Sequence, residues 1–134
     1  MKKYFFIAAG GFSGAVLRYI STRIHIPWHI GSIPLNVLFI NVSGSFLMLL
    51  LLSIPFLSQE ENRDLKLCLT TGFLGAYTTF STLCKESSNL LSTKQYIPFL
   101  IYTASSIILG LVSAYAGNLL GKKIFLRKES PGGR

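Results

Sequence analysis

The stretch Thr70–Thr82, TTGFLGAYTTFST, determines how the rest of the chain is interpreted. It lies in an uncharged run close to the length of a membrane span, yet it holds five threonines, two glycines, a tyrosine and a serine. Glycine and threonine are weak helix formers, so the helix is expected to break near Gly72, Gly75 and residues 77–79. In a bilayer, every freed backbone N–H and C=O needs a partner from protein, an ion or cavity water. The stretch therefore predicts a broken span whose free backbone N–H and C=O groups form hydrogen bonds outside the helix or bind an ion.

The composition is that of a membrane protein. Half of the 134 residues are hydrophobic, only 13% are charged, and the mean hydropathy is +0.50. We expect an all-α membrane protein with one four-helix transmembrane domain over 1–127 and helices at about 3–23, 33–57, 65–91 and 96–120. Residues 128–134 are expected to form a basic, disordered tail, and the ending SPGGR resembles the remnant of a cleaved tag.

The formal net charge of +8 comes from basic residues that flank the hydrophobic segments. This distribution indicates membrane topology and not a nucleic-acid partner. With four spans, both termini and the second loop share one side of the membrane. The positive-inside rule then predicts cytoplasmic termini and a multi-pass protein of the inner (plasma) membrane. The nine basic residues of that side are Lys2, Lys3, Arg63, Lys66, Lys122, Lys123, Arg127, Lys128 and Arg134, and the four opposite are Arg18, Arg23, Lys85 and Lys94.

A stripe of hydroxyl groups follows the expected break. Thr78, Ser81, Thr82 and Lys85 recur at i, i+3, i+4 and i+7, which places them on one helix face. In the fourth helix Tyr102 precedes Ser106 by one turn, and both could add hydroxyls to the same path.

Asn41 and the positions of the acidic residues further limit the functions that the sequence allows. An amide within a span is expected either to bond a neighbouring helix or to line a wet path, and both remain open for Asn41. Glu86 is expected near the end of its span, which leaves no carboxylate at membrane depth for proton coupling. No catalytic motif is present, so the chain is not predicted to be an enzyme. Hydroxyl and amide donors suit a small hydrated anion, because they replace its water without a fixed charge that would hold it tightly.

Three sequence blocks resemble the Fluc fluoride channels, also called CrcB proteins. The blocks are GGFSGAVLRY at Gly10–Tyr19, NVSGSF at Asn41–Phe46 and GFLGAYTTFST at Gly72–Thr82. The resemblance implies an antiparallel, dual-topology dimer in the lipid bilayer that exports fluoride down its gradient through two pores between the subunits. The anion-pathway residues that it implies are Asn41, Phe80, Ser81, Thr82, Tyr102, Ser106 and Arg18. It also implies a structural sodium ion on the dimer axis, held by the backbone carbonyls of Gly75 and Thr78.

The chain departs from the family pattern at two places. Leu83 replaces a second phenylalanine, and Asn36-Val37 replaces a Gly-Thr pair. The unequal Lys and Arg distribution also differs from the near balance that a homodimer of dual topology needs. We therefore predict one half of a heterodimer with a second Fluc-type subunit, with a homodimer as the alternative. Two other functions remain open, a small four-helix exporter of cationic drugs and a non-conducting assembly subunit.

Overall fold

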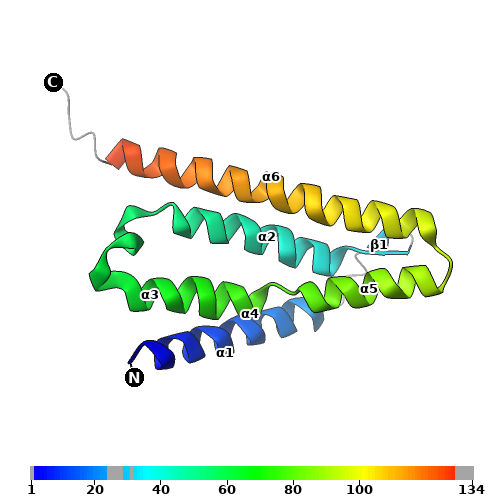
Figure 1. The fold of residues 1–134 in the computed structure, drawn as a ribbon, viewed down its shortest axis with the longest axis horizontal. Helices are drawn as coiled ribbons and strands as arrows, with labels where there is room; N and C mark the ends of the chain where they lie inside the picture. Colours follow the sequence, from blue (N-terminus) through cyan, green and yellow to red (C-terminus); the bar gives the residue numbers. More distant parts are fainter. Residues whose placement is uncertain (1, 24–28, 31, 129–134) are drawn as a thin grey trace.

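The computed structural model describes residues 2–23, 29–30 and 32–128, and within these the chain is almost entirely helical. Both ends of the described chain lie at the same end of the molecule, as four consecutive crossings require (Figure 1). The helices and strands are α1 Lys2–Arg23, β1 His29–Ile30, β2 Ile33–Pro34, α2 Leu35–Leu52, the 3-10 turns η1 Pro55–Ser58 and η2 Glu60–Asn62, α3 Arg63–Leu67, the π-helical η3 Cys68–Leu74, α4 Gly75–Tyr77, α5 Phe80–Ser92 and α6 Tyr96–Lys128.

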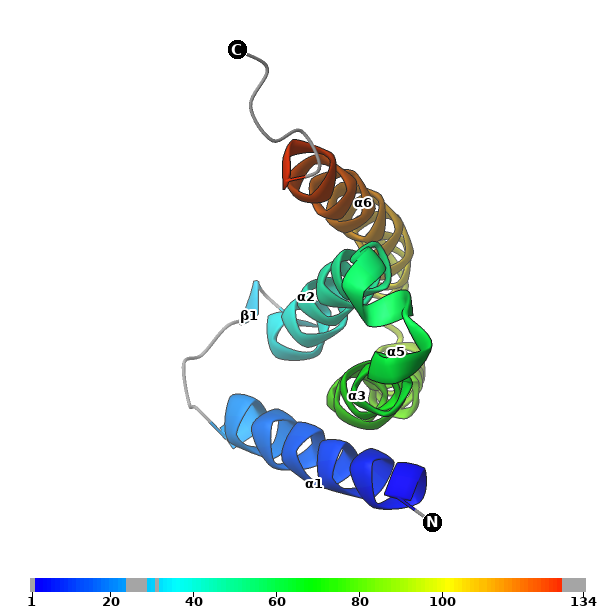
Figure 2. The ribbon, with the colours of Figure 1, turned by 90° about the vertical axis from the view of Figure 1, so that its left-hand side faces the viewer.

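The helices are arranged in the order α6, α2, the broken third helix and α1 (Figures 1 and 2). The third helix comprises α3, η3, α4 and α5, so it lies between α1 on one side and α2 on the other. Strands β1 and β2 form only a two-residue antiparallel pair in the connection before α2. The all-α architecture predicted from the sequence is confirmed, and this short hairpin is the one pair of strands in the described residues.

The predicted break in the third helix is present, and it lies between α4 and α5. Thr78 and Thr79 both have extended backbone, with φ and ψ of −73° and 155° at Thr78 and −146° and 114° at Thr79. The glycines do not form the break, because Gly72 lies within η3 and Gly75 is helical. The helix therefore stops at the threonines: Thr78 still bonds the Leu74 carbonyl, whereas the backbone of Thr79 finds its partner on α2.

Two helix ends differ from the predicted bounds. Helix α2 stops at Leu52 and not at residue 57, because Ser53 caps it and Pro55 begins a 3-10 turn. Helix α6 continues to Lys128, past residue 120, since nothing between Gly121 and that point interrupts the helix. Residues 129–134 of the expected tail lie outside the described residues.

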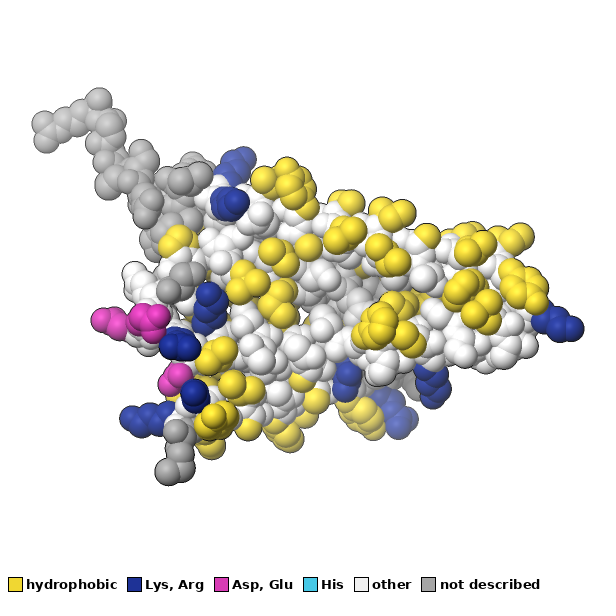
Figure 3. All heavy atoms as spheres, in the orientation of Figure 1, with side chains coloured by type: hydrophobic (Ala, Val, Ile, Leu, Met, Phe, Trp, Pro, Cys, Tyr) yellow, Lys and Arg dark blue, Asp and Glu magenta, His cyan; other side chains and the backbone are white. Residues whose placement is uncertain are grey.

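Few side chains are buried, and large apolar side chains cover the surface. The small core consists of Ile40, Leu74 and Tyr77, with Phe73 stacked on Tyr77 at a centroid distance of 6.3 Å. Hydrophobic side chains spread along the length of the molecule on the visible face, whereas the acidic side chains seen there lie at one end and basic side chains lie at both ends and along the lower edge (Figure 3). By length and composition α2 and residues Tyr96–Ile124 of α6 could each cross a membrane. A surface this apolar is suited to contact with lipid.

Glycines bring helix backbones into direct contact where side chains would hold them apart. A Cβ on Gly14 would overlap the Phe73 carbonyl oxygen, and one on Gly10 would overlap the Cys68 carbonyl oxygen. Reciprocally, a Cβ on Gly72 would lie 2.6 Å from the Ile7 carbonyl oxygen. Close approach of this kind is how helices associate in lipid, where the hydrophobic effect gives no preference for protein over acyl chains.

We predict that Gly14→Ala destabilises the protein whereas Gly11→Ala does not. The added methyl group at position 14 must displace the backbone of η3, at a cost of about 1–3 kcal/mol typical of overpacking. Gly11 has nothing within 4 Å of its Cβ position, so alanine there only improves helix propensity, by up to about 1 kcal/mol. Thermal unfolding in detergent measures both. Equal stabilities of the two variants would contradict the close contact between α1 and η3.

Candidate functional site

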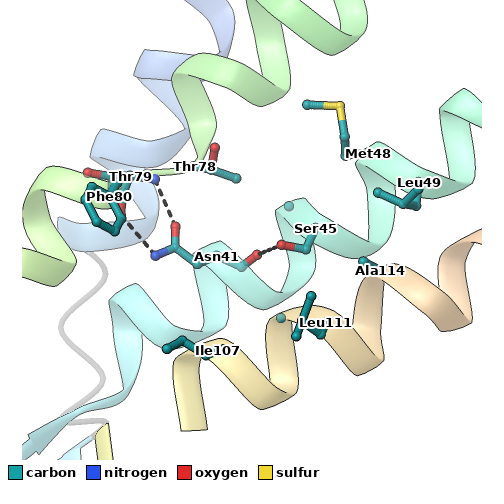
Figure 4. Close-up of a pocket in the computed structure, with 12 residues that line it drawn as sticks. Asn41, Ser45, Met48, Leu49, Thr78, Thr79, Phe80, Ile107, Leu111 and Ala114 are labelled. Atoms are coloured by element: carbon teal, nitrogen blue, oxygen red, sulfur yellow. Dashed lines mark hydrogen bonds between the residues drawn. The ribbon is translucent and has the colours of Figure 1, made fainter. Parts of the chain in front are cut away.

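The side chain of Asn41 on α2 completes the hydrogen bonds of the broken helix. Its Nδ2 donates to the Thr79 carbonyl oxygen at 3.0 Å, and its Oδ1 accepts the Thr79 N–H at 2.9 Å (Figure 4). The two bonds satisfy a donor and an acceptor that the break removes from the helix. Of the two roles that the sequence left open for Asn41, the structure shows the bond to a neighbouring helix.

Thr79 is also the N-cap of α5. Its Oγ1 accepts the Thr82 N–H at 3.2 Å, as capping threonines do at the first turn of a helix. The same oxygen lies 2.9 Å from Thr82 Oγ1 and 3.3 Å from Ser81 Oγ. Three hydroxyls thus gather at the start of α5, beside the amide of Asn41. The sequence placed Ser81 and Thr82 on this path but missed Thr79, which a search for N-cap residues could have found.

The break leaves the Gly75 carbonyl without its usual helical donor. Thr78 N–H bonds the Leu74 carbonyl at 3.0 Å, and the Thr78 hydroxyl bonds the same oxygen at 3.0 Å. The next N–H, that of Thr79, goes to Asn41, so the Gly75 carbonyl does not receive the i,i+4 bond of a continuous helix. The extended ψ of Thr78 turns its own carbonyl away from the helical direction.

Helix α2 approaches the break closely because of Gly44. A Cβ on Gly44 would overlap the Thr78 Cγ2 methyl group, so only glycine allows this approach without a shift of the break. Gly44 lies one turn after Asn41, and the two residues therefore support Thr78 and Thr79 from the same face of α2.

An open groove of about 480 Å³ runs along the molecule beside the break. The Phe80 side chain is 77% exposed at this groove, although it is a large aromatic group at the start of a helix. Apolar side chains make up most of the remaining lining (Figure 4). The lining residues are Asn41, Gly44, Ser45, Met48, Leu49, Thr78, Thr79, Phe80, Ile107, Gly110, Leu111 and Ala114.

A second polar contact joins α5 to α6. Tyr102 is fully buried, and its hydroxyl donates to the Glu86 carboxylate. Glu86 lies six residues before Ser92, where α5 ends, and Tyr102 reaches it from α6. Glu86 follows Thr82 by one helical turn, so it extends the hydroxyl face of α5. The sequence did not predict the bond between Tyr102 and Glu86, because it joins two different helices.

The other predicted pathway residues are not all part of one cluster. The Ser106 hydroxyl donates to the Tyr102 carbonyl at 2.7 Å, within its own helix. Arg18 is half-buried on α1, and no hydrogen bond or ion pair among the described residues links it to the rest of the site. The structure thus brings together Asn41, Phe80, Ser81 and Thr82, pairs Tyr102 with Glu86, and leaves Arg18 apart.

A family model described as "CrcB-like protein, Camphor Resistance (CrcB)" matches residues 5–118, which include every residue of the site described above. The chain belongs to the CrcB family. Members of this family are ion channels and not enzymes, and the membrane location of CrcB proteins agrees with the apolar surface.

Three curated relatives align over nearly their whole length. "Fluoride-specific ion channel FluC 1" of Staphylococcus aureus (strain NCTC 8325 / PS 47) is 36% identical over 119 residues, covering 89% of this chain and 96% of the relative. "Fluoride-specific ion channel FluC" of Ignicoccus hospitalis is 36% identical over 124 residues, covering 92% and 98%. The protein of the same name from Thermosipho melanesiensis is 36% identical over 127 residues, covering 92% and 99%.

We predict that Asn41→Leu destabilises this CrcB protein more than Asn36→Leu does. Leucine at position 41 leaves both the N–H and the carbonyl of Thr79 unsatisfied, at about 1–3 kcal/mol for each buried group. Asn36 lies on the same helix, and no side-chain bond from it to a described residue is present. Thermal unfolding of both variants in the same detergent makes the comparison. If Asn41→Leu were no worse than its control, the bridge to Thr79 would not hold the break.

Proposed function

We propose that the chain forms a fluoride-selective channel that lets fluoride leave the cytoplasm down its gradient. The observation that carries the proposal is the exposed Phe80 ring at the groove, next to hydroxyls gathered at a helix break. Family membership supports it, because the curated relatives are named fluoride-specific ion channels.

The local chemistry suits an anion that holds its water strongly. The edge of an aromatic ring carries partial positive charge, so the Phe80 ring can face an anion. It attracts the anion less strongly than a fully charged side chain would. Ser81 and Thr82 offer hydroxyl donors one and two residues further along. Tyr102 and Ser106 continue the proposed path on α6, and Arg18 attracts anions toward its entrance. Donors of modest strength replace hydration and still release the ion.

The pathway lies, in this proposal, between two subunits inserted antiparallel. The groove is open on one side, and its lining comes from α2, the break and α6, so a second subunit would enclose it and Phe80 together. Twofold symmetry or pseudosymmetry then generates two pores. The apolar portion of the lining, such as Met48, Ile107 and Leu111, would pack against the partner.

A sodium ion on the dimer axis fits the donors present at the break. The Gly75 carbonyl lacks its helical N–H donor, and the Thr78 carbonyl follows extended backbone. Unwound backbone carbonyls are typical ligands for sodium in membrane proteins. Two such carbonyls from each of two chains would satisfy groups that one subunit leaves open, and the dimer should dissociate more readily when N-methylglucamine replaces sodium in the buffer.

The partner, in this proposal, is a different subunit of the same family. Lys and Arg side chains are concentrated at the end of the molecule that holds both termini (Figure 3). This bias favours insertion with cytoplasmic termini, whereas a homodimer needs copies in both orientations. Leu83, without a ring edge, is compatible with a chain whose partner supplies the more complete pathway.

We predict that Phe80→Ile reduces fluoride efflux from liposomes by about tenfold or more, equivalent to roughly 1.4 kcal/mol of lost stabilisation. The reason is that isoleucine has no ring edge to face the ion. Phe12→Ile is the matched control, because Phe12 is 75% exposed on α1 and away from the groove. A fluoride electrode measures both rates. Unchanged efflux in Phe80→Ile would show that Phe80 does not line the pathway.

We also predict that this chain alone conducts poorly in liposomes, and that co-expression with a second CrcB-type subunit restores efflux. A single chain with a fixed orientation cannot form the antiparallel pair. Chloride efflux measured in parallel tests selectivity. Robust fluoride efflux from the chain by itself would refute the heterodimer while leaving the channel proposal in place.

A further inference from the structure

The groove at the end of α2 is a site that the fluoride pathway does not use. Helix α6 lies directly against α2 here, because a Cβ on Gly117 would overlap the Phe46 carbonyl oxygen. A Cβ on Gly121 would lie 2.6 Å from Ser53 Cβ and 3.0 Å from the Leu50 carbonyl oxygen. The residues that follow these two glycines, Asn118 and Lys122, are thereby fixed at the edge of the helix contact.

The groove itself has a volume of about 450 Å³ and combines two kinds of lining. Leu49, Leu52 and Pro55 are apolar, whereas Ser53, Asn118 and Lys122 are polar or charged. Ser53 Oγ lies 2.7 Å from the Leu49 carbonyl oxygen and 2.7 Å from the Asn118 amide, which holds that amide at the groove. An asparagine amide has two N–H donors, so one contact with Ser53 leaves it able to donate to a ligand. Asn118 and Lys122 are one turn apart on α6, so the two donors are neighbours.

The charge at this end of α6 is unbalanced. Lys122 makes no ion pair with any carboxylate of the described residues, and Lys123 is also exposed. Basic side chains lie at this end of α6, whereas the acidic side chains visible on the same face lie beside η2 and α3 (Figure 3). The 33 residues of α6 extend roughly 50 Å against a hydrocarbon thickness of about 30 Å, so its last turns reach the headgroup layer.

We propose that this groove binds the headgroup of an anionic phospholipid. The Lys122 ammonium and the Asn118 amide nitrogen bond the phosphodiester, while Leu49 and Leu52 contact the first part of an acyl chain. A basic pocket between helices at the membrane surface is the usual recognition site for such lipids. Leu49 also lines the groove beside Phe80, so the bound lipid would lie at the rim of the proposed subunit interface.

The test compares Lys122→Gln with Lys123→Gln, because both remove one charge from neighbouring exposed positions and only Lys122 lines the groove. Detergent-purified protein is titrated with phosphatidylglycerol or phosphatidylcholine, and bound lipid is counted by native mass spectrometry. The unaltered chain and Lys123→Gln should retain phosphatidylglycerol in preference to phosphatidylcholine. Lys122→Gln should lose that preference by about tenfold, as for one charge-assisted contact.

Three results would overturn the proposal. Equal losses in the two variants would indicate diffuse attraction to the basic end of α6. Full competition by soluble glycerol phosphate would indicate a site for free phosphate. A change in dimerisation of Lys122→Gln without any change in lipid preference would indicate that the second subunit covers the groove. None of these measurements depends on fluoride transport.

Discussion

The two hydrogen bonds between the Asn41 amide and the backbone of Thr79 are the interaction on which the rest of the site depends. A span can leave the helical conformation at membrane depth only if another group receives its N–H and carbonyl. Asn41 supplies both from the neighbouring helix, and Gly44 lets that helix come close enough to do so. Phe80 then begins a new helix at the groove, instead of continuing the old one.

The helices are also held together largely by backbone groups and small residues. Contacts between α1 and η3, and between α2 and α6, run through glycine and backbone carbonyl groups. The Ser113 hydroxyl adds a bond to the Val42 carbonyl at 2.8 Å between α6 and α2. Large hydrophobic residues are thereby left exposed on the surface, and the hydroxyls of α5 keep their own arrangement around Thr79.

The sequence was sufficient for four long helices and for a break in the third, because both follow from local composition. It was not sufficient for the partners of the break, since Asn41 and Thr79 are 38 residues apart and meet only when α2 packs on α5. The bond between Tyr102 and Glu86 was missed for the same reason, because it joins α6 to α5. The length of α6 was underestimated, since a helix can continue beyond the apolar run that predicts it.

The interruption at Thr78 and Thr79 also has an electrostatic consequence. Helix α4 ends there with outward carbonyls, and α5 begins there with N–H groups, so two helix termini of opposite polarity lie two residues apart. Each terminus carries about half an elementary charge. A break of this kind thus presents partial negative charge on one side and partial positive charge on the other. It does so with no ionised side chain of its own, so its field does not change with pH.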